Sequence, residues 1–172
     1  MESTQIMEVP SEVEHTLSDK WVLWAHLPHD TDWSLKSYTN LLEISSVEDI
    51  TTLYNSVPDK MTKNCMLFLM RKNINPTWED PKNASGGCFS FKIPNKNVVD
   101  IWKDLCYLAV GENLSTNKTF QKSINGLTIS PKKSFCIIKI WLTNLKFQSP
   151  RLLRKVDKLP IDGCLFKKHK SH

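Results

Sequence analysis

Short apolar and alternating segments, separated by polar turns, constrain the fold of this chain more than any other feature. Residues 88–93 alternate between apolar and small or polar side chains, as strands do, and residues 65–70 form the apolar run of a buried strand. Further strands are predicted at residues 21–25, 38–44, 126–130, 135–142 and 161–166. Because short turns join most consecutive strands, the pattern favours an antiparallel sheet with helices packed on one face.

Three segments carry the signals of helices. Residues 97–110 have an apolar stripe at helical spacing and a glycine just beyond the stripe. A helix is predicted at residues 46–56, because Ser45 and Glu48, three residues later, resemble a capping box at its start. Residues 149–158 begin with serine at the cap and proline at the first helical position.

The length and composition predict one globular domain, and the order of the expected strands and helices predicts the α+β class. The chain has 172 residues, of which 40% are hydrophobic, so it can bury a proper core. Residues 1–18 lack periodicity and carry several glutamates, and we interpret them as a flexible N-terminal tail. The folded domain is then expected over residues 19–172.

Charge and motif content narrow the function. The net charge of +5, from 23 Lys and Arg against 18 Asp and Glu, suits a local anionic ligand better than a wide DNA footprint. The sequence has no glycine-rich phosphate loop, no nucleophile motif and no metal-ligand cluster, so we expect no enzyme, no cofactor and no metal. Five cysteines without a CxxC pair predict reduced thiols and a cytoplasmic location, with the nucleus as the alternative. No apolar run reaches membrane-spanning length, and we expect a monomer without membrane or DNA partners.

Trp78 and Glu79 place an aromatic plane directly beside a carboxylate in a loop of turn-forming residues. A tryptophan can stack on a base, and a carboxylate can accept hydrogen bonds from the N1–H and 2-amino groups of guanine. Such a site needs a second aromatic plate, and Trp33, in a polar loop, is the candidate. Lys132 and Lys133 occupy the turn before residues 135–142, where they either hold phosphates as point charges or are solvated surface lysines.

These residues resemble the eukaryotic translation initiation factor 4E family, whose members bind the 7-methylguanosine cap of mRNA. The resemblance covers roughly residues 15–172, and all six tryptophans fall at tryptophan positions of the family. It rests on residues 21–24, residues 47–55, the loop of residues 78–80 with Asn83, Gly86 and Gly87, residues 101–102 and 111–112, and residues 140–141. The resemblance implies a curved antiparallel sheet with three helices on its convex face and the cap on its concave face.

Capped mRNA is therefore the expected partner, and the family's pattern assigns roles to individual residues. Trp33 and Trp78 match the two plates that sandwich the methylated base, where its positive charge adds a cation–π contribution. Glu79 matches the carboxylate that reads guanine. Trp141 matches the tryptophan that lies against the methyl group.

The chain departs from the family at the phosphate end of the site. Cys88 stands where the family has an arginine after the glycine pair, and Ile137 stands at a later phosphate-binding lysine. Lys132 matches the next phosphate-binding arginine. We expect triphosphate binding to be weaker, or to have moved to Lys132, Lys133 or the basic C-terminus.

The surface that binds partner helices in the family, called dorsal below, departs as well. Thr51 replaces the tryptophan that packs a Tyr-x-x-x-x-Leu helix, and Lys103 and Tyr107 replace a leucine pair. The resemblance implies a 4G-like scaffold or another partner helix on this face. The expected contact residues are His15, Val47, Thr51, Lys103, Asp104 and Tyr107.

Three functions remain open from the sequence. The first is a cap-binding protein that supports translation initiation. The second is a divergent cap binder that acts as a translational repressor or decoy with a non-standard partner, as a specialised paralogue or virus-encoded copy would. The third is a protein-interaction module that has lost the cap.

Overall fold

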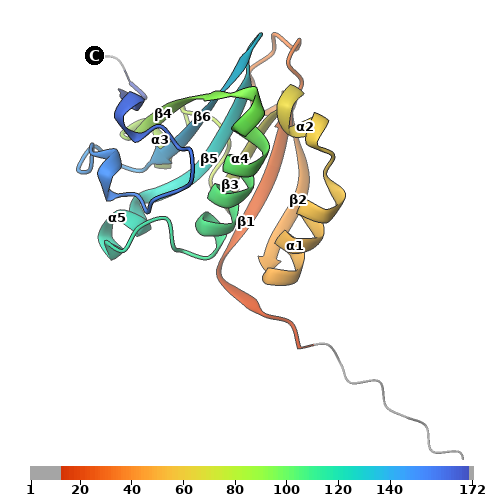
Figure 1. The fold of residues 1–172 in the computed structure, drawn as a ribbon, viewed down its shortest axis with the longest axis horizontal. Coiled ribbons are helices and arrows are strands. Elements are labelled where there is room, and N and C mark those ends of the chain that lie inside the picture. The colour runs from red at the N-terminus through yellow and green to blue at the C-terminus, as the bar shows by residue number, and fades with distance from the viewer. Residues whose placement is uncertain (1–12, 171–172) are drawn as a thin grey trace, which may run out of the picture.

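A seven-stranded antiparallel sheet forms the centre of the protein in a computed structural model that describes residues 13–170 (Figure 1). The spatial order of the strands is β2-β1-β3-β5-β6-β4-β7. Their bounds are β1 Thr16–His26, β2 Tyr38–Ser46, β3 Met66–Arg71, β4 Gly87–Pro94, β5 Ile124–Pro131, β6 Phe135–Leu142 and β7 Leu165–Lys168. The predicted antiparallel sheet and the α+β class are therefore confirmed.

The N-terminal boundary differs from the one expected. Strand β1 begins at Thr16, which pairs with Ser46 of β2. Residues 16–18, assigned to the tail from their polarity, thus belong to the sheet, because backbone pairing does not require apolar side chains. Residues 13–15 precede the strand, and residues 1–12 of the expected tail lie outside the described part of the chain.

Three helices cover one face of the sheet: α1 (Val47–Ser56), α2 (Asp59–Asn64) and α4 (Asn95–Val110) (Figure 1). The shorter helices α3 (Pro81–Ala84) and α5 (Lys118–Ser123) precede strands β4 and β5. Single 3₁₀ turns occur at Leu35–Ser37 (η1), Pro150–Leu152 (η2) and Ile161–Gly163 (η3). Within residues 13–170 no helix has the length and apolar character needed to cross a membrane.

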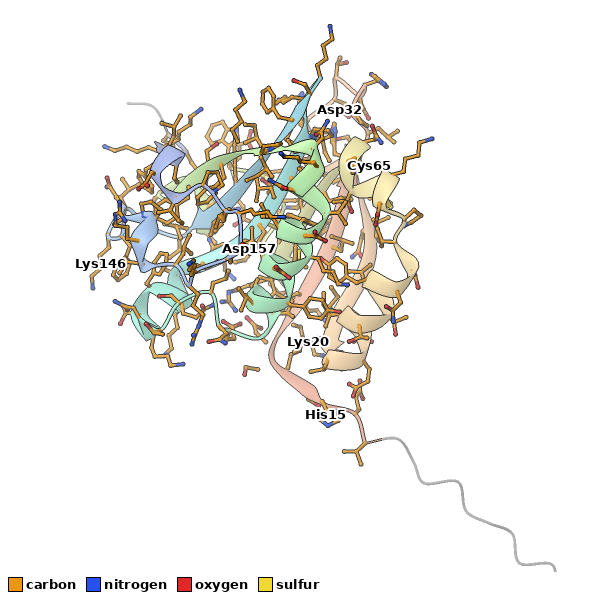
Figure 2. All side chains as sticks on the ribbon, viewed as in Figure 1. His15, Lys20, Asp32, Cys65, Lys146 and Asp157 are labelled. Atoms are coloured by element: carbon orange, nitrogen blue, oxygen red, sulfur yellow. The ribbon has the colours of Figure 1, made fainter. Side chains whose placement is uncertain are left out.

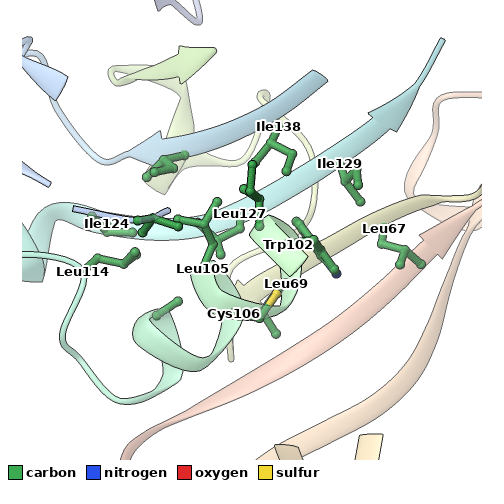
Figure 3. Close-up of a cluster of buried hydrophobic side chains, with 14 of the residues drawn as sticks. Leu67, Leu69, Trp102, Leu105, Cys106, Leu114, Ile124, Leu127, Ile129 and Ile138 are labelled. Carbon is green, nitrogen blue, oxygen red and sulfur yellow. The ribbon is translucent and has the colours of Figure 1, made fainter. Parts of the chain in front are cut away.

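The apolar stripe of α4 forms the centre of the core. Trp102 and Leu105 point from α4 toward Leu127 of β5 and Leu69 of β3 (Figure 3). Successive side chains of a strand point to opposite faces of the sheet. Every second residue of β4 and β6 therefore lies on the face away from the helices. That opposite face carries Ser90 and Lys92 on β4 and Ile137, Lys139 and Trp141 on β6.

The helix predicted at residues 149–158 is wrong. Only η2 is helical, and the segment that follows is held by tertiary contacts instead of by helical hydrogen bonds. Leu153, Val156 and Leu159 are buried in the core, and the backbone N–H of Arg154 donates to the carbonyl of Leu114 at 2.7 Å. That tertiary hydrogen bond replaces the i→i−4 bond of a helix, so local cap signals could not predict the outcome.

The cap of α1 lies one residue later than predicted. Ser46, and not Ser45, accepts from the backbone N–H of Asp49, and the Asp49 carboxylate accepts from the Ser46 backbone N–H in return. The capping residue three positions on is therefore Asp49, not Glu48. Glu48 instead binds His15, whose backbone N–H donates to its carboxylate at 3.0 Å.

Two adjacent glycines allow strands to approach closely behind the Trp78 loop. A Cβ at Gly86 would collide with the carbonyl oxygen of Leu142, and one at Gly87 would lie 2.5 Å from the carbonyl oxygen of Lys167. Neither collision can be relieved by a side-chain movement, because both involve backbone atoms. The pair therefore lets β4 lie between β6 and β7 beneath the candidate site.

Candidate functional site

A cavity of about 220 Å³ opens on the face of the sheet opposite helices α1, α2 and α4. Trp33, Trp78, Glu79 and Trp141, the four residues predicted to contact the base, all line it. Pro76 and Thr77 of the Trp78 loop add to the wall, and strands β2, β3, β5 and β6 supply the rest, including Tyr38, Met66, Phe68, Thr128, Ser130 and Lys139. The structure thus brings together residues separated by more than a hundred positions in the sequence.

Trp33 is held by a histidine that sequence reasoning did not select. The Trp33 and His26 rings stack with centroids 4.2 Å apart and an interplanar angle of 1°. His26 is buried, and its Nε2 lies 2.8 Å from the carbonyl of Asp32; a carbonyl only accepts, so Nε2 carries the proton. Trp33 remains 52% exposed and lines the cavity, whereas His26 does not. His26 therefore supports the face of Trp33 that is turned away from the cavity.

The loop that carries Trp78 and Glu79 is fixed by buried polar side chains. The carboxylate of Asp80 accepts from the backbone N–H groups of Asn75 at 2.9 Å and Lys82 at 2.8 Å. These bonds cap α3 and close the loop on itself, since they join its two ends. Trp78 is consequently presented at the rim of the cavity, 46% exposed, on an ordered backbone.

Asn83 connects the same loop to the sheet. Its side-chain amide donates to the carbonyls of Asn75 at 3.2 Å and Thr77 at 2.9 Å. Its amide oxygen accepts from Asn125, which lies in β5 and is also buried. Asn83 is fully buried, so these bonds satisfy polar groups that water cannot reach.

Trp141 forms part of the cavity floor and is 8% exposed. Its Nε1–H donates to Thr128 Oγ1 at 3.3 Å, and its ring packs against His169, with centroids 4.7 Å apart. His169 Nδ1 lies 2.7 Å from the carbonyl of Asn83, so Nδ1 is the donor. Burial, aided by the charge of Lys139, lowers the pKa of His169 and favours the neutral ring. From the sequence, His169 had been assigned only to a basic C-terminus.

The cavity wall around Glu79 disfavours a second negative charge, as the pKa of Tyr38 shows. Burial raises the pKa of the Tyr38 hydroxyl to about 12, and the Glu79 carboxylate contributes in the same direction. Tyr38 therefore stays neutral at physiological pH, and Glu79 is the acidic residue among those that line the cavity. A ligand that presents hydrogen-bond donors and a positive charge matches this wall.

The phosphate end of the predicted site opens into a second cavity of about 360 Å³. Lys132 lines this cavity together with Ile137, whereas the lining residues do not include Lys133. Cys88 is buried, and desolvation raises the pKa of its thiol, so a neutral thiol occupies the position where the family has an arginine. Ser130 and Lys139 line both cavities, so the two are adjacent.

The predicted dorsal residues form two groups. The His15 side chain contacts the Glu48 carboxylate and lowers the pKa of that carboxyl group. The backbone carbonyl of His15 accepts from the N–H of Val47 at 2.9 Å. Thr51 is exposed, and its hydroxyl donates to the carbonyl of Val47 at 2.9 Å. Figure 2 shows His15 at the end of the molecule far from Asp32, which adjoins Trp33.

The second dorsal group lies on α4 and meets α1 through Tyr54. The rings of Tyr54 and Tyr107 lie 5.2 Å apart, and the Lys103 ammonium lies 6.0 Å from the Tyr54 ring centre. Asp104 shares a surface cavity with Tyr107. The dorsal surface therefore presents charged and hydroxyl groups where the resemblance implied leucine and tryptophan.

Comparisons with known proteins support one family. Residues 16–171 match the family model described as "Eukaryotic initiation factor 4E". The "Eukaryotic translation initiation factor 4E" of Eremothecium gossypii is 29% identical over 147 residues, which span 81% of this chain and 67% of the relative. A homologue of this factor from Acanthamoeba polyphaga mimivirus is 28% identical over 146 residues, so the match spans about half of that longer protein, 54%.

Solved structures share the fold. A schistosome eIF4E complexed with m7GpppG and 4E-BP superimposes with a TM-score of 0.72 at 24% identity, over 82% of this chain and 79% of that one. Caenorhabditis elegans eIF4E-3, in complex with the 4E-binding protein Mextli and a cap analogue, gives a TM-score of 0.71 at 21% identity, over 81% and 80%. At these identities the likeness establishes the architecture.

Proposed function

The chain belongs to the eukaryotic initiation factor 4E family, and from this premise we propose that it binds the 7-methylguanosine cap of mRNA in translation initiation. The convergence of Trp33, Trp78, Glu79 and Trp141 on one cavity carries the proposal. Its function is recognition and not catalysis. We place this activity in the cytoplasm, where capped mRNA is translated.

The base would lie between Trp33 and Trp78. Both rings are half-exposed at the rim, so each can offer a face, and methylated guanine adds a positive charge that strengthens stacking by about 0.5–2 kcal/mol. Glu79 would accept hydrogen bonds from N1–H and the 2-amino group, which distinguish guanine from adenine. Trp141, on the floor, would contact the methyl group.

The phosphates would leave the base cavity toward Lys132. The opening that Lys132 lines adjoins the base cavity through Ser130, which gives the phosphate chain a continuous path. Lysine supplies charge without the bidentate geometry of arginine, so phosphate recognition would be electrostatic more than directional. Phosphate binding by Lys133, its neighbour in the turn, stays a prediction.

The dorsal surface favours a second proposal about the partner. Exposed Thr51, with Lys103 nearby on α4, gives an amphipathic Tyr-x-x-x-x-Leu helix little apolar area to cover. The two solved structures described above are complexes with 4E-binding proteins. We propose that a protein partner binds the dorsal surface of this chain as well. Weak binding of the usual scaffold would make the protein a repressor or decoy.

The base-recognition proposal is tested by substituting Glu79 without changing its shape. Glu79→Gln keeps the size but replaces an acceptor with a donor, which would face the guanine N1–H. We expect a loss of m7GTP affinity of at least roughly 30-fold, because a buried donor is left unpaired. Trp78→Ala should remove retention on an m7GTP resin. Quenching of tryptophan fluorescence during titration with m7GTP and GTP measures both effects.

Glu43→Gln is the matched control, because Glu43 is exposed on β2 and contacts Lys72 away from the cavity. Its m7GTP affinity should equal that of the wild type. Equal affinity of the wild type for m7GTP and GTP would reject cap recognition and favour an interaction module that has lost the cap.

A further inference from the structure

The second cavity is lined by four lysines from separate parts of the sheet. Lys92 lies on β4, Lys139 on β6, Lys167 on β7, and Lys132 just after β5. Strand register explains their convergence, because Lys139 pairs with Ser90 and the next β4 residue on that face, Lys92, pairs with Ile137. On the other side of β4, Lys167 pairs with Cys88.

The positive charge of this cavity is not neutralised within residues 13–170. None of the four lysines takes part in the ion pairs that the structure forms there. The residues that line the cavity include no aspartate or glutamate. Like charges gathered in a concave site repel one another and raise the local concentration of anions.

Lys139 joins the lysine cavity to the base cavity, since it lines both. In register it pairs with Thr128 on β5 and Ser90 on β4, two small residues that leave space around its long side chain. Lys139 and Trp141 line the same cavity, two positions apart on β6 and on the same face of the sheet. An anion that continues from a base in the first cavity would meet Lys139 first.

We propose that Lys92, Lys139 and Lys167 form a subsite for the oligophosphate chain of the capped nucleotide, with Lys139 at the junction with the base cavity. The subsite deepens the proposed function and rests on it for the identity of the attached base. Where the family has an arginine, this chain has Cys88, and the charges of the three lysines on β4, β6 and β7 would take over the role of that arginine. The subsite also makes β7, near the C-terminus, part of the ligand site.

The chemistry of the subsite determines how affinity should vary. Ammonium groups hold phosphates as point charges, so binding should strengthen with each added phosphate and weaken with salt. Removal of a lysine that contacts a phosphate should therefore lessen the dependence of m7GTP affinity on salt concentration. Stacking of the base, in contrast, should depend weakly on salt.

The test compares ligands that differ only in phosphate number. Wild type, Lys139→Met and Lys167→Met are titrated with 7-methylguanosine, m7GMP, m7GDP and m7GTP at two salt concentrations. Methionine keeps an apolar stem and removes the charge. We expect each variant to lose roughly 5- to 10-fold in m7GTP affinity. Lys167→Met, at a residue outside the base cavity, should keep its 7-methylguanosine affinity within about twofold. Lys60→Met, on α2, is the control and should behave as wild type.

Inorganic tripolyphosphate tests the subsite without a base. Calorimetry should show binding to wild type and to Trp78→Ala, and a marked loss in the double variant Lys139→Met/Lys167→Met. Unchanged tripolyphosphate and m7GTP affinities in that double variant would overturn the subsite while leaving cap binding intact. If the wild type fails to prefer m7GTP over GTP, the proposed function fails, and the tripolyphosphate titration still decides the subsite.

Discussion

Trp33 illustrates how a binding residue depends on a neighbour that does not touch the ligand. One face of its ring lies flat against His26, so the indole has little freedom to rotate. His26 also contacts Tyr38, with centroids 4.9 Å apart, and Tyr38 contacts Phe68 of β3 at 5.2 Å. The exposed plate is thereby connected through aromatic contacts to a buried strand.

We predict that His26→Ala weakens m7GTP binding by roughly 3- to 10-fold, because an aromatic pair contributes about 0.5–1.5 kcal/mol. His26→Phe should recover most of the affinity, since it restores the stacked ring without the hydrogen bond to Asp32. Fluorescence titration at a temperature where all variants are folded measures the change. His29→Ala alters an exposed histidine of the same loop and should have no effect. An affinity of His26→Ala equal to wild type would show that Trp33 needs no support.

Residue chemistry that is local in sequence was predictable, and chemistry created by packing was not. Trp78 and Glu79 were identifiable because they are adjacent and surrounded by turn formers. His26 and Lys139 were not, because their roles come from a stacked ring and from strand register across β5, β6 and β4. A lysine in an apolar strand was the available signal for Lys139, since alternation places it on the face opposite the core.

At the scale of elements, the Trp78 loop is positioned by side-chain amides and not by regular secondary structure. Asn83 joins three segments, the start of the loop, helix α3 and strand β5. Asn83 and Asn125 are both buried, so the removal of one amide leaves the other without this partner. The loop therefore depends on Asn83 more than its small size suggests.

Asn83→Ala should lower the free energy of unfolding by about 1–3 kcal/mol, because the half-buried Thr77 carbonyl loses its donor and the buried Asn125 amide loses one of its acceptors. In protein that is still folded, m7GTP affinity should fall roughly 5- to 10-fold, since Trp78 and Glu79 lose their fixed geometry. Urea unfolding and fluorescence titration measure the two effects separately. Asn64→Ala serves as the control, because Asn64 is exposed and donates only within α2. A destabilised but fully binding variant would mean that the loop is ordered by other contacts.

Secondary structure was predictable where periodicity and burial agree. Helix α4 and most strands follow from the apolar stripe and from alternation, and they were found near their predicted bounds. The last strand is an exception, because it was predicted at residues 161–166, whereas Ile161–Gly163 forms the turn η3 and β7 spans Leu165–Lys168. The segment after Ser149 was not predictable, because Leu153, Val156 and Leu159 recur every three residues and satisfy core contacts in a non-helical path. The backbone N–H of Arg154 donates to Leu114 in a distant segment, a contact that no local pattern records.

For the molecule as a whole, the sheet separates two surfaces with different functions. The base cavity and the lysine cavity lie on the face opposite α1 and α4, whereas all the dorsal residues except His15 lie on those two helices. The core between them is closely packed and buried, so ligands on the two faces make no contact with each other. Cap binding and partner binding should therefore be separable by substitution.

Thr51 provides the sharpest test of that separation. Wild type should bind a helical Tyr-x-x-x-x-Leu peptide weakly, because Thr51 is exposed and offers only a hydroxyl that is bonded to Val47. Thr51→Trp should raise the peptide affinity by roughly 10- to 30-fold, since a tryptophan supplies the apolar anchor typical of interface hot spots. Its m7GTP affinity should stay within about twofold of wild type.

Fluorescence anisotropy of a labelled peptide measures the first effect, and m7GTP titration measures the second. Thr52→Trp is the matched control, because Thr52 is also exposed on α1 but points in a different direction around the helix. Thr52→Trp should leave the peptide and m7GTP affinities unchanged. The gain in peptide affinity from Thr51→Trp would then depend on the position of the tryptophan and not on added hydrophobicity alone. Tight binding of the peptide by wild type, with no gain from Thr51→Trp, would show that this surface recruits the usual scaffold without a tryptophan. The repressor or decoy proposal would then be rejected, while recognition of the cap on the opposite face would stand.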